Sequence, residues 1–221
     1  MVSGSFNYLP PEDTGLDLLY QDQGLIVVNK PAGLLTVPGR DQDKQDCLIS
    51  RVQREFASAR IVHRLDMATS GAIVIALNDE IHRQLSMLFE QRKVAKRYVA
   101  IVNGLLEGEG VINLPLITDW PNRPKQIIDH ERGKPARTRF SAKHYDHTTH
   151  SSRVELIPET GRTHQIRVHL LSLGHAILGD RLYASDEVRD QSPRLLLHST
   201  LLSFSHPASN KPITIHSAEP F

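Results

Sequence analysis

Short apolar segments separated by turn residues run along the whole chain and predict a protein rich in β-strands. Apolar runs such as residues 24–28 and 71–76 exclude a disordered chain. Seven segments have the length and composition of strands, namely residues 16–20, 25–29, 72–77, 98–102, 137–145, 153–157 and 195–203.

Three further segments predict helices, namely residues 46–56, 78–89 and 163–173. Asp46 and Asn78 are the expected N-caps of the first two, because their side-chain oxygens can accept hydrogen bonds from a first helical turn. Gly174 is the expected stop of the third. Strands outnumber helices and do not alternate strictly with them, which favours an α+β fold with a mixed, largely antiparallel sheet.

The chain is expected to form a single domain over residues 16–221, preceded by an N-terminal extension of residues 1–15. No internal repeat, Gly/Ser-rich linker or glycine-rich nucleotide-binding fingerprint is present. Residues 115–135 are rich in Pro, Lys and Arg and are expected to form a long surface loop. Loops of that length are usually functional or disordered.

Composition narrows the class of protein. With 39% hydrophobic and 23% charged residues among 221, the chain is typical of a globular protein. No segment approaches the roughly 20 apolar residues of a membrane-spanning helix, and the N-terminus lacks the layout of a secretory signal. The single cysteine, Cys47, permits no intrachain disulfide, so we expect a cytoplasmic protein.

The charge balance neither requires nor excludes a nucleic-acid partner. Lysine and arginine total 26 against 25 acidic residues, a formal net charge of +1. Basic residues nevertheless cluster within positions 92–97 and 123–139, and phosphates respond to the local field more than to the net charge. The alternative is that both clusters are ordinary solvated surface.

The densest group of polar residues is His63-Arg64-Leu65-Asp66-Met67-Ala68-Thr69-Ser70-Gly71. It precedes a strongly apolar strand, and a loop that leads into a buried strand can hold a carboxylate, here Asp66, in a fixed position. Thr69 and Ser70 are expected to brace the loop through side-chain to backbone hydrogen bonds. The same pattern also fits a purely structural Arg-Asp turn.

A second polar segment is Gly161-Arg162-Thr163-His164-Gln165-Ile166-Arg167-Val168-His169. If it opens a helix, Arg167 and His164 share a face, and the cation can pair with a distant carboxylate and keep it ionised. An ionised carboxylate suits nucleophilic attack or electrostatic stabilisation. The alternative is a surface helix. Tyr98, which opens a strand, is either half-buried packing or a platform on which a base stacks.

Together these segments resemble the motifs of the RluA family of pseudouridine synthases. Residues 63–71 match the catalytic HRLDxxTSG pattern at every fixed position, and residues 30–33 are similar to the first motif. Tyr98 falls on the family's tyrosine, residues 162–169 resemble the third motif, and residues 194–198 resemble the apolar strand that walls the pocket. The five motifs occur in order across most of the chain.

The resemblance implies the pseudouridine synthase fold, with an active-site cleft across the sheet, and isomerisation of uridine in RNA after the nucleotide is flipped out of its stack. Asp66 would attack the anomeric carbon of the ribose or abstract a sugar proton, and Arg167 would hold it ionised. Tyr98 would stack on the uracil and accept its C5 proton.

The remaining site residues follow from the same resemblance. Arg64 would occupy the gap left by the flipped base. The other expected RNA-binding residues are His63, Arg162, Arg123, Lys125 and Lys96, and His63 would also hold the catalytic loop. The expected supports of the pocket are Lys30, Thr69, Ser70 and Leu196, with Leu196 or a neighbour as its apolar wall.

A finer match, carried by residues 20–22 and 119–126, indicates a branch of the family that modifies both 23S ribosomal RNA and the anticodon stem-loop of tRNA. The N-terminal extension is too short for an additional RNA-binding domain of the S4 type. No metal or redox cofactor is expected, because detaching and rejoining uracil is redox-neutral. A monomer is the expected state.

Two other functions fit parts of the pattern. A metal-dependent hydrolase could use the closely spaced His144, His147 and His150, with His164 and His169 nearby in sequence. A non-catalytic RNA-binding module would need the basic clusters but not Asp66, Tyr98 and Arg167.

Overall fold

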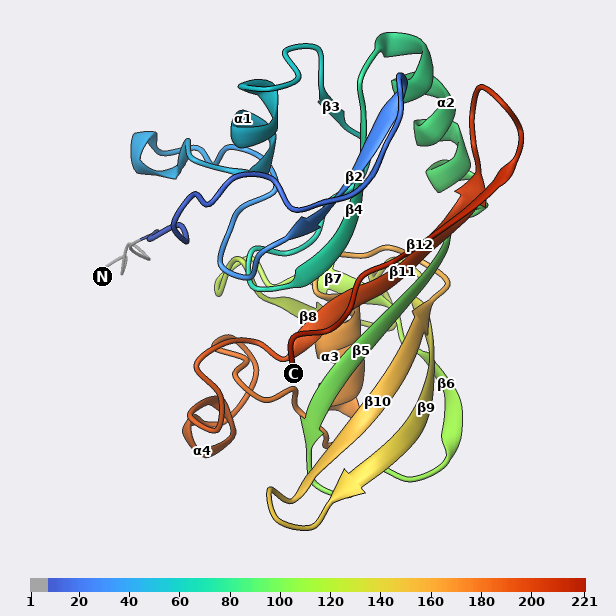
Figure 1. Cartoon of the computed structure of the whole chain (residues 1–221). Coiled ribbons are helices and arrows are strands. Elements are labelled where there is room, and N and C mark those ends of the chain that lie inside the picture. Colours follow the sequence, from blue (N-terminus) through green and yellow to red (C-terminus); the bar gives the residue numbers. More distant parts are fainter. Residues whose placement is uncertain (1–7) are drawn as a thin grey trace.

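The computed structural model describes residues 8–221, so residues 1–7 of the predicted N-terminal extension lie outside the described range. A large sheet dominates the molecule (Figure 1). Its strands are β1 (Leu18–Gln21), β2 (Leu25–Lys30), β3 (Arg60–Ile61), β4 (Ser70–Ala76), β5 (Ala95–Asn103), β6 (Glu109–Asn113), β9 (Arg137–Asp146), β10 (Ser151–Pro158), β11 (Leu197–Ser205) and β12 (Pro212–His216). The seven predicted strands are β1, β2, β4, β5, β9, β10 and β11.

The strands pair in the order β1-β2-β4-β11-β5-β10-β9-β6, with β3 beside β4 and β12 beside β11. Within residues 8–221, β4 and β11 form the single parallel pair of this sheet, and the other pairs are antiparallel. The prediction of an α+β fold with a mixed, largely antiparallel sheet is confirmed.

The three predicted helices are present as α1 (Leu48–Gln53), α2 (Asp79–Glu90) and α3 (Gln165–Ser172), and two short helical turns, η1 (Gln42–Lys44) and α4 (Asp186–Arg189), accompany them. Asn78 caps α2 as predicted, because its side chain accepts a hydrogen bond from the backbone N–H of Ile81. Gly174 follows α3 with a φ of 86°, the left-handed conformation in which helices commonly stop.

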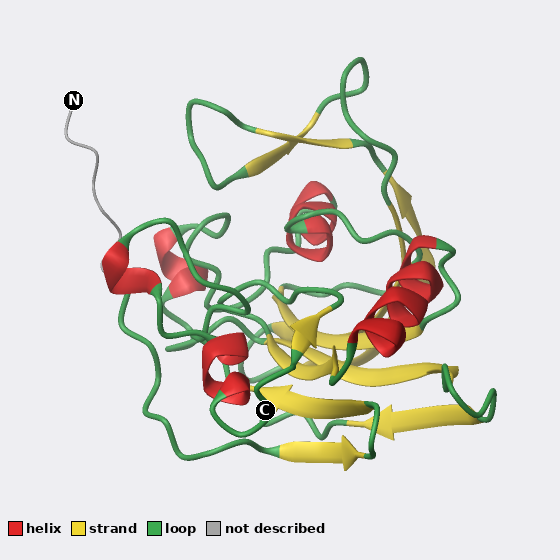
Figure 2. Ribbon diagram, turned by 90° about the horizontal axis from the view of Figure 1, so that it is seen from above, coloured by secondary structure: helices red, strands yellow, loops and turns green. Residues whose placement is uncertain are grey.

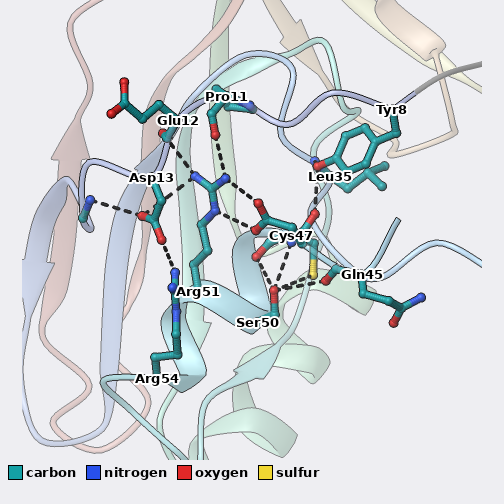
Figure 3. Close-up of polar contacts among 12 residues, drawn as sticks. Tyr8, Pro11, Glu12, Asp13, Leu35, Gln45, Cys47, Ser50, Arg51 and Arg54 are labelled. Atoms are coloured by element: carbon teal, nitrogen blue, oxygen red, sulfur yellow. Dashed lines mark hydrogen bonds and ion pairs between the residues drawn. The ribbon is translucent and has the colours of Figure 1, made fainter. Parts of the chain in front are cut away.

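The prediction that Asp46 caps α1 is wrong. Cys47 occupies the N-cap and forms a reciprocal capping box with Ser50. The Asp46 carboxylate instead accepts two hydrogen bonds from Arg51, both at 2.8 Å (Figure 3). A two-point charged pair is stronger than a neutral cap bond. Arg51 also donates to the backbone carbonyl of Pro11 at 2.7 Å, so this pair ties the N-terminal segment to α1.

The continuous apolar runs of β2 and β4 are explained by helices that pack on opposite faces of these strands. Leu25, Val27 and Val74 contact the cluster that contains Ile81 and Leu85 of α2. The alternating residues of the same strands belong to the cluster that contains Leu48 and Val52 of α1. A strand covered on both faces has no position that favours a polar residue.

Residues 115–135, predicted to be a surface loop, contain the two-stranded sheet β7 (Leu116–Thr118) and β8 (Gln126–Ile128). The segment lies at the surface as predicted, with most of its residues exposed or partly exposed. It is not a loop throughout, because Leu116 and Ile128 of this β7–β8 hairpin pack with Val168 of α3. Helix α3 contacts β9 and β10 of the large sheet as well as β8. It therefore connects the hairpin to the sheet (Figure 2).

Strand register brings the polar motifs together. Gly71, at the end of the first polar segment, pairs with Ser199 of β11, and Ser199 pairs on its other side with Tyr98 of β5. Tyr98 in turn pairs with Leu156 of β10, the strand that leads into the segment before α3. The polar segments, which are distant in sequence, therefore lie together at one end of the four adjacent strands β4, β11, β5 and β10.

Gly71 is the tightest point of this arrangement, and its substitution tests the register. Its φ is 113°, and an added Cβ would lie 2.4 Å from the Ser199 carbonyl oxygen. Gly71→Ala is therefore expected to lower the free energy of unfolding by at least about 3 kcal/mol. The matched control is Gly174→Ala, where φ is 86° and nothing lies within 4 Å, at a cost of about 1–2 kcal/mol. Equal losses in urea unfolding would contradict this account.

Candidate active site

A cleft of about 1740 Å³ is lined by side chains from all five sequence motifs. It is larger than the roughly 300–1,000 Å³ typical of a pocket for a small ligand. Tyr8 and Leu9 of the N-terminal segment and Pro124 of the β7–β8 hairpin also contribute to its lining. Its size suits a segment of a polymer better than a single small molecule.

The cleft is basic although the whole chain is nearly neutral. Eight lysines and arginines line it against three carboxylates. Sequence reasoning had selected four of the eight for the site, and those it had not selected are Lys44, Arg92, Arg181 and Arg194. The net charge of +1 therefore conceals a concentration of positive charge in the place where a polyanion would bind.

The backbone on both sides of Asp66 is fixed by hydrogen bonds. The carbonyl of Leu65 accepts a hydrogen bond from Thr36 Oγ1 at 2.7 Å, and the carbonyl of Met67 accepts one from Lys30 Nζ at 3.1 Å. Because both neighbouring peptide groups are anchored, the Asp66 side chain projects into the cleft from a defined position.

Lys30 acts as a buried centre of hydrogen bonding. Its side chain is fully buried, and Nζ also donates to the carbonyls of Pro31 at 2.8 Å and Leu34 at 2.7 Å. Burial lowers the pKa of Lys30 to about 7, and the charge of Asp66 opposes that shift. All three ammonium donors are satisfied by backbone carbonyls, so Lys30 supports the loop from behind and does not line the cleft.

Two nitrogens approach the Asp66 side chain, which is 26% exposed. Arg167 Nη1 lies 3.6 Å and His164 Nε2 lies 3.9 Å from the same oxygen, Oδ2. The expected pairing of Asp66 with Arg167 is therefore present. Within residues 8–221, no side-chain hydrogen bond engages the Asp66 carboxylate beyond these two ion-pair contacts, which leaves it open to a substrate.

The strongest partner of Arg167 is Asp180, which sequence reasoning missed. Arg167 Nε and Nη2 donate to the two Asp180 oxygens at 2.8 and 2.7 Å, and the side chains are 4% and 1% exposed. Asp180 also accepts backbone hydrogen bonds from Leu182 and Tyr183. This two-point pair fixes the plane of the guanidinium, and its third nitrogen, Nη1, points toward Asp66.

The first turn of α3 is held by Gln165, a second residue that sequence reasoning missed. Its Oε1 accepts hydrogen bonds from Thr160 Oγ1 and the Arg162 N–H, and its Nε2 donates to the Arg137 carbonyl and Thr138 Oγ1. Every donor and acceptor of the amide is thus used. Residues 165–170 are all buried, so the alternative of a surface helix is wrong.

Two tyrosines flank the reactive groups. Tyr98 is 9% exposed and lines the cleft, and burial raises its pKa to about 12. Tyr183, which sequence reasoning did not single out, places its ring 5.0 Å from the Arg167 guanidinium carbon. Its hydroxyl lies 2.7 Å from His164 Nδ1. Burial raises the pKa of Tyr183 to about 12 as well, so both phenols remain protonated at neutral pH.

The rest of the catalytic loop divides into bracing and exposed side chains. His63 stacks on Phe89 at a centroid distance of 4.4 Å, and burial lowers its pKa to about 3. These features indicate that His63 braces the loop, and His63 also lines the cleft in which contact with RNA is expected. Arg64 is exposed and lines the cleft. The Ser70 hydroxyl contacts the side chains of His198 and Arg194, and not the backbone as predicted.

Several expected site residues occupy different places. Leu196 does not line the cleft; its neighbours Leu195 and Leu197 do, because adjacent side chains on a strand point to opposite faces. Arg123 and Lys125 lie on the β7–β8 hairpin beside the cleft lining rather than in it. Lys96, Arg162 and Thr69 line the cleft; Thr69 is buried, and its N–H donates to the Asp66 carbonyl.

The histidines weighed as metal ligands do not converge. His164 bonds to Tyr183, whereas His169 lies between Thr138 and the Leu114 carbonyl. In the part of the chain that the structure describes, no group of three or more potential ligand side chains forms a metal site. Among residues 8–221, every helix is too short or too polar to span a bilayer.

Comparison with known proteins agrees with this geometry. The RNA pseudouridylate synthase family model matches residues 24–172. The chain belongs to this family, as its motifs predicted, and it is an RNA pseudouridine synthase that isomerises uridine to pseudouridine.

Individual relatives extend the similarity over nearly the whole chain. The chain is 50% identical to the dual-specificity RNA pseudouridine synthase RluA of Escherichia coli (strain K12) over 219 residues, which covers 99% of this chain and 100% of that protein. It is 46% identical to the protein of the same name from Haemophilus influenzae, over 97% and 98% of the two chains. The solved structure of human RNA pseudouridylate synthase domain containing 1 superposes with a TM-score of 0.80 at 30% identity, over 96% and 87% of the chains.

Removal of the Arg167 side chain tests the buried pair. Arg167→Ala leaves Asp180 as a buried carboxylate without its guanidinium, which is expected to lower the free energy of unfolding by about 3–5 kcal/mol. The control is Arg189→Ala, which breaks exposed pairs with Asp186 and Asp190 and should cost far less, because solvent screens exposed ion pairs. Urea unfolding of both variants provides the comparison, and parental stability of Arg167→Ala would disprove the pairing.

His198 is expected to make the fold sensitive to acid. Burial lowers its pKa from near 6.5 to about 4, and its two nitrogens contact Ser70 and Ser217. Because the folded-state pKa is the lower one, stability is full above pH 6.5 and is lost as the pH falls toward 4. In that window His198→Gln should reduce the pH slope of the unfolding free energy by about 1.4 kcal/mol per pH unit. Parallel curves for parent and variant would contradict this.

Proposed function

We propose that Asp66 is the catalytic carboxylate that reacts with the ribose of the target uridine. The observation that supports this assignment is the placement of its carboxylate in the cleft, with Arg167 Nη1 and His164 Nε2 beside Oδ2 and no hydrogen bond from a side chain of residues 8–221. Attack on the anomeric carbon and removal of a neighbouring sugar proton both require a carboxylate oxygen that can reach the ribose. Arg167 Nη1, 3.6 Å away, places a positive charge beside that carboxylate.

Tyr98 is assigned the role of a stacking platform for the uracil. Tyr98 lies on β5, and its ring lines the cleft. Strand β5 pairs with β11, which pairs on its other side with Gly71 of β4. Burial raises the pKa of Tyr98 to about 12, so the phenol is protonated at neutral pH. The role of acceptor for the C5 proton, predicted from the sequence beside the stacking role, therefore requires that Tyr98 first give up its own proton.

RNA is proposed to bind along the basic cleft with the target nucleotide flipped out of its stack. Arg64, exposed two residues before Asp66, fills the space that the flipped base leaves. Lys96 and Arg162 contact the backbone from the cleft lining. On the β7–β8 hairpin, Arg123 stacks over Trp120 at 4.7 Å, and Trp120 is 66% exposed, which suits contact with an unpaired base.

The proposed substrates are 23S ribosomal RNA and the anticodon stem-loop of tRNA. The match at residues 119–126 and the dual specificity named for the relatives support this assignment. Recognition of both RNAs in one cleft is expected to depend on the shape of a loop with splayed bases. We further propose that the enzyme acts as a cytoplasmic monomer and without a metal or redox cofactor, since the isomerisation transfers no electrons.

Asp66→Asn is expected to abolish turnover while leaving the fold and the affinity for RNA largely intact, because the change removes the charge and keeps the shape. Tritium release from uridine-labelled RNA measures turnover, and filter binding measures affinity. The control is Glu107→Gln, an exposed carboxylate outside the cleft. Turnover retained by Asp66→Asn would refute the catalytic assignment.

Substrate choice is tested by mapping pseudouridines in ribosomal and transfer RNA from a strain that lacks the gene. The proposal expects one site to disappear from each RNA and both to return on complementation. Loss from one RNA alone would contradict dual specificity and leave the assignment of Asp66 intact.

A further inference from the structure

A continuous line of polar contacts connects the β7–β8 hairpin to the catalytic carboxylate. The backbone N–H of Gln126, the first residue of β8, donates to the Tyr183 hydroxyl at 2.8 Å. That hydroxyl lies 2.7 Å from His164 Nδ1, and His164 Nε2 lies 3.9 Å from Asp66 Oδ2. Four segments that are distant in sequence therefore meet through one phenol and one imidazole.

The direction of these hydrogen bonds follows from the donors available. Tyr183 has one proton, and its oxygen already accepts the Gln126 N–H. Among the described residues, His164 Nδ1 is the acceptor within reach of that proton. His164 therefore accepts at Nδ1 and carries its own hydrogen on Nε2, the nitrogen directed at Asp66. Burial lowers the pKa of His164 and so favours this neutral form.

The hairpin end of this line is positioned to respond to RNA. Pro124 in the hairpin turn lines the cleft, and Trp120 in the same turn is exposed. The Gln126 side chain donates to the Pro124 carbonyl at 3.2 Å and accepts from Thr118 Oγ1. A shift of the turn is thus transmitted to the Gln126 N–H.

The catalytic end of the line is held in a conformation that has an energetic cost. His164 has a φ of 55°, a left-handed conformation that is uncommon outside glycine and costs about 1–3 kcal/mol. Such strain persists where surrounding contacts fix it. At 3.9 Å, His164 Nε2 lies beyond a good hydrogen bond to Asp66, so a small shift of the imidazole would complete that contact.

We propose that Tyr183 is a positioning residue that couples the seating of RNA on the β7–β8 hairpin to the alignment of His164 with Asp66. When RNA draws the hairpin against the cleft, Gln126 and Tyr183 move His164 Nε2 onto Oδ2 and orient the carboxylate toward the ribose. The inference rests on the proposed contact of the hairpin with RNA.

Tyr183→Phe removes the hydroxyl and keeps the ring that packs beside Arg167. The single-turnover rate at saturating RNA is expected to fall about 10- to 100-fold, because a small misplacement of a reacting group has an effect of that size. The affinity for RNA should change less than about threefold. The matched control is Tyr145→Phe, which removes a hydroxyl from an exposed contact with His150 and should leave both quantities unchanged.

A double-mutant cycle with Trp120→Ala tests the coupling itself. In the parent, Trp120→Ala should weaken RNA binding about tenfold and also lower the saturated single-turnover rate. In the Tyr183→Phe background it should weaken binding by the same factor but no longer lower that rate. Equal effects on the rate in both backgrounds would overturn the coupling. An unchanged affinity of Trp120→Ala would instead show that the hairpin does not bind RNA, and the coupling would fall with it.

A second variant distinguishes loss of this contact from a general loss of structure. His164→Asn retains a residue type that tolerates the left-handed conformation, but its side chain is too short to join Tyr183 to Asp66. It should reproduce the rate defect and the loss of coupling while thermal unfolding stays cooperative. A parental single-turnover rate in His164→Asn would refute the proposal.

Discussion

The buried pair of Arg167 and Asp180 is the constraint on which the active site depends. The Arg167 guanidinium is only 4% exposed. The fold can bury it only because it is paired, since an unpaired charge in the interior has a high desolvation cost. Asp180 satisfies two of its nitrogens and so fixes the direction of the third. The Asp66 carboxylate then meets a cation whose position is set by the protein interior and not by solvent. This is preorganisation in the ordinary sense: the charges are in place before the substrate arrives.

The large sheet makes this arrangement possible by the order of its central strands. Strands β4, β11, β5 and β10 lie side by side, and each carries or leads into one of the motifs. Rigid strands set positions more accurately than free loops do. The loop around Asp66 gains comparable rigidity from Lys30 and Thr36, which anchor the peptide groups on either side of it.

Much of this architecture was predictable from the sequence, and the misses have physical causes. Long periodic segments such as β4 and α2 were predicted well, because burial on a face determines their pattern. The cleft wall was assigned to Leu196 or a neighbour, and the neighbours Leu195 and Leu197 form it, since a shift of one residue reverses the face of an extended segment. Asp180 and Tyr183 carry no spacing signal that links them to α3. The Gly179-Asp180 turn after an apolar run was the available hint.

The hairpin was missed for a related reason. Its strands have three residues each, and their stability comes from packing on α3 rather than from their own alternation. The local sequence pattern of a strand does not indicate a contact with a helix that is distant in sequence.

The uneven distribution of charge has a consequence for how the enzyme meets its substrate. Removal of the cleft residues from the total leaves eighteen basic and twenty-two acidic side chains on the rest of the chain. An approaching polyanion is therefore repelled by most of the surface and attracted at one opening. The electric field of the RNA therefore rotates the enzyme during diffusion, so that the cleft faces the RNA. Productive encounters then become more frequent than a random collision would allow, and non-specific adhesion to bulk RNA stays low.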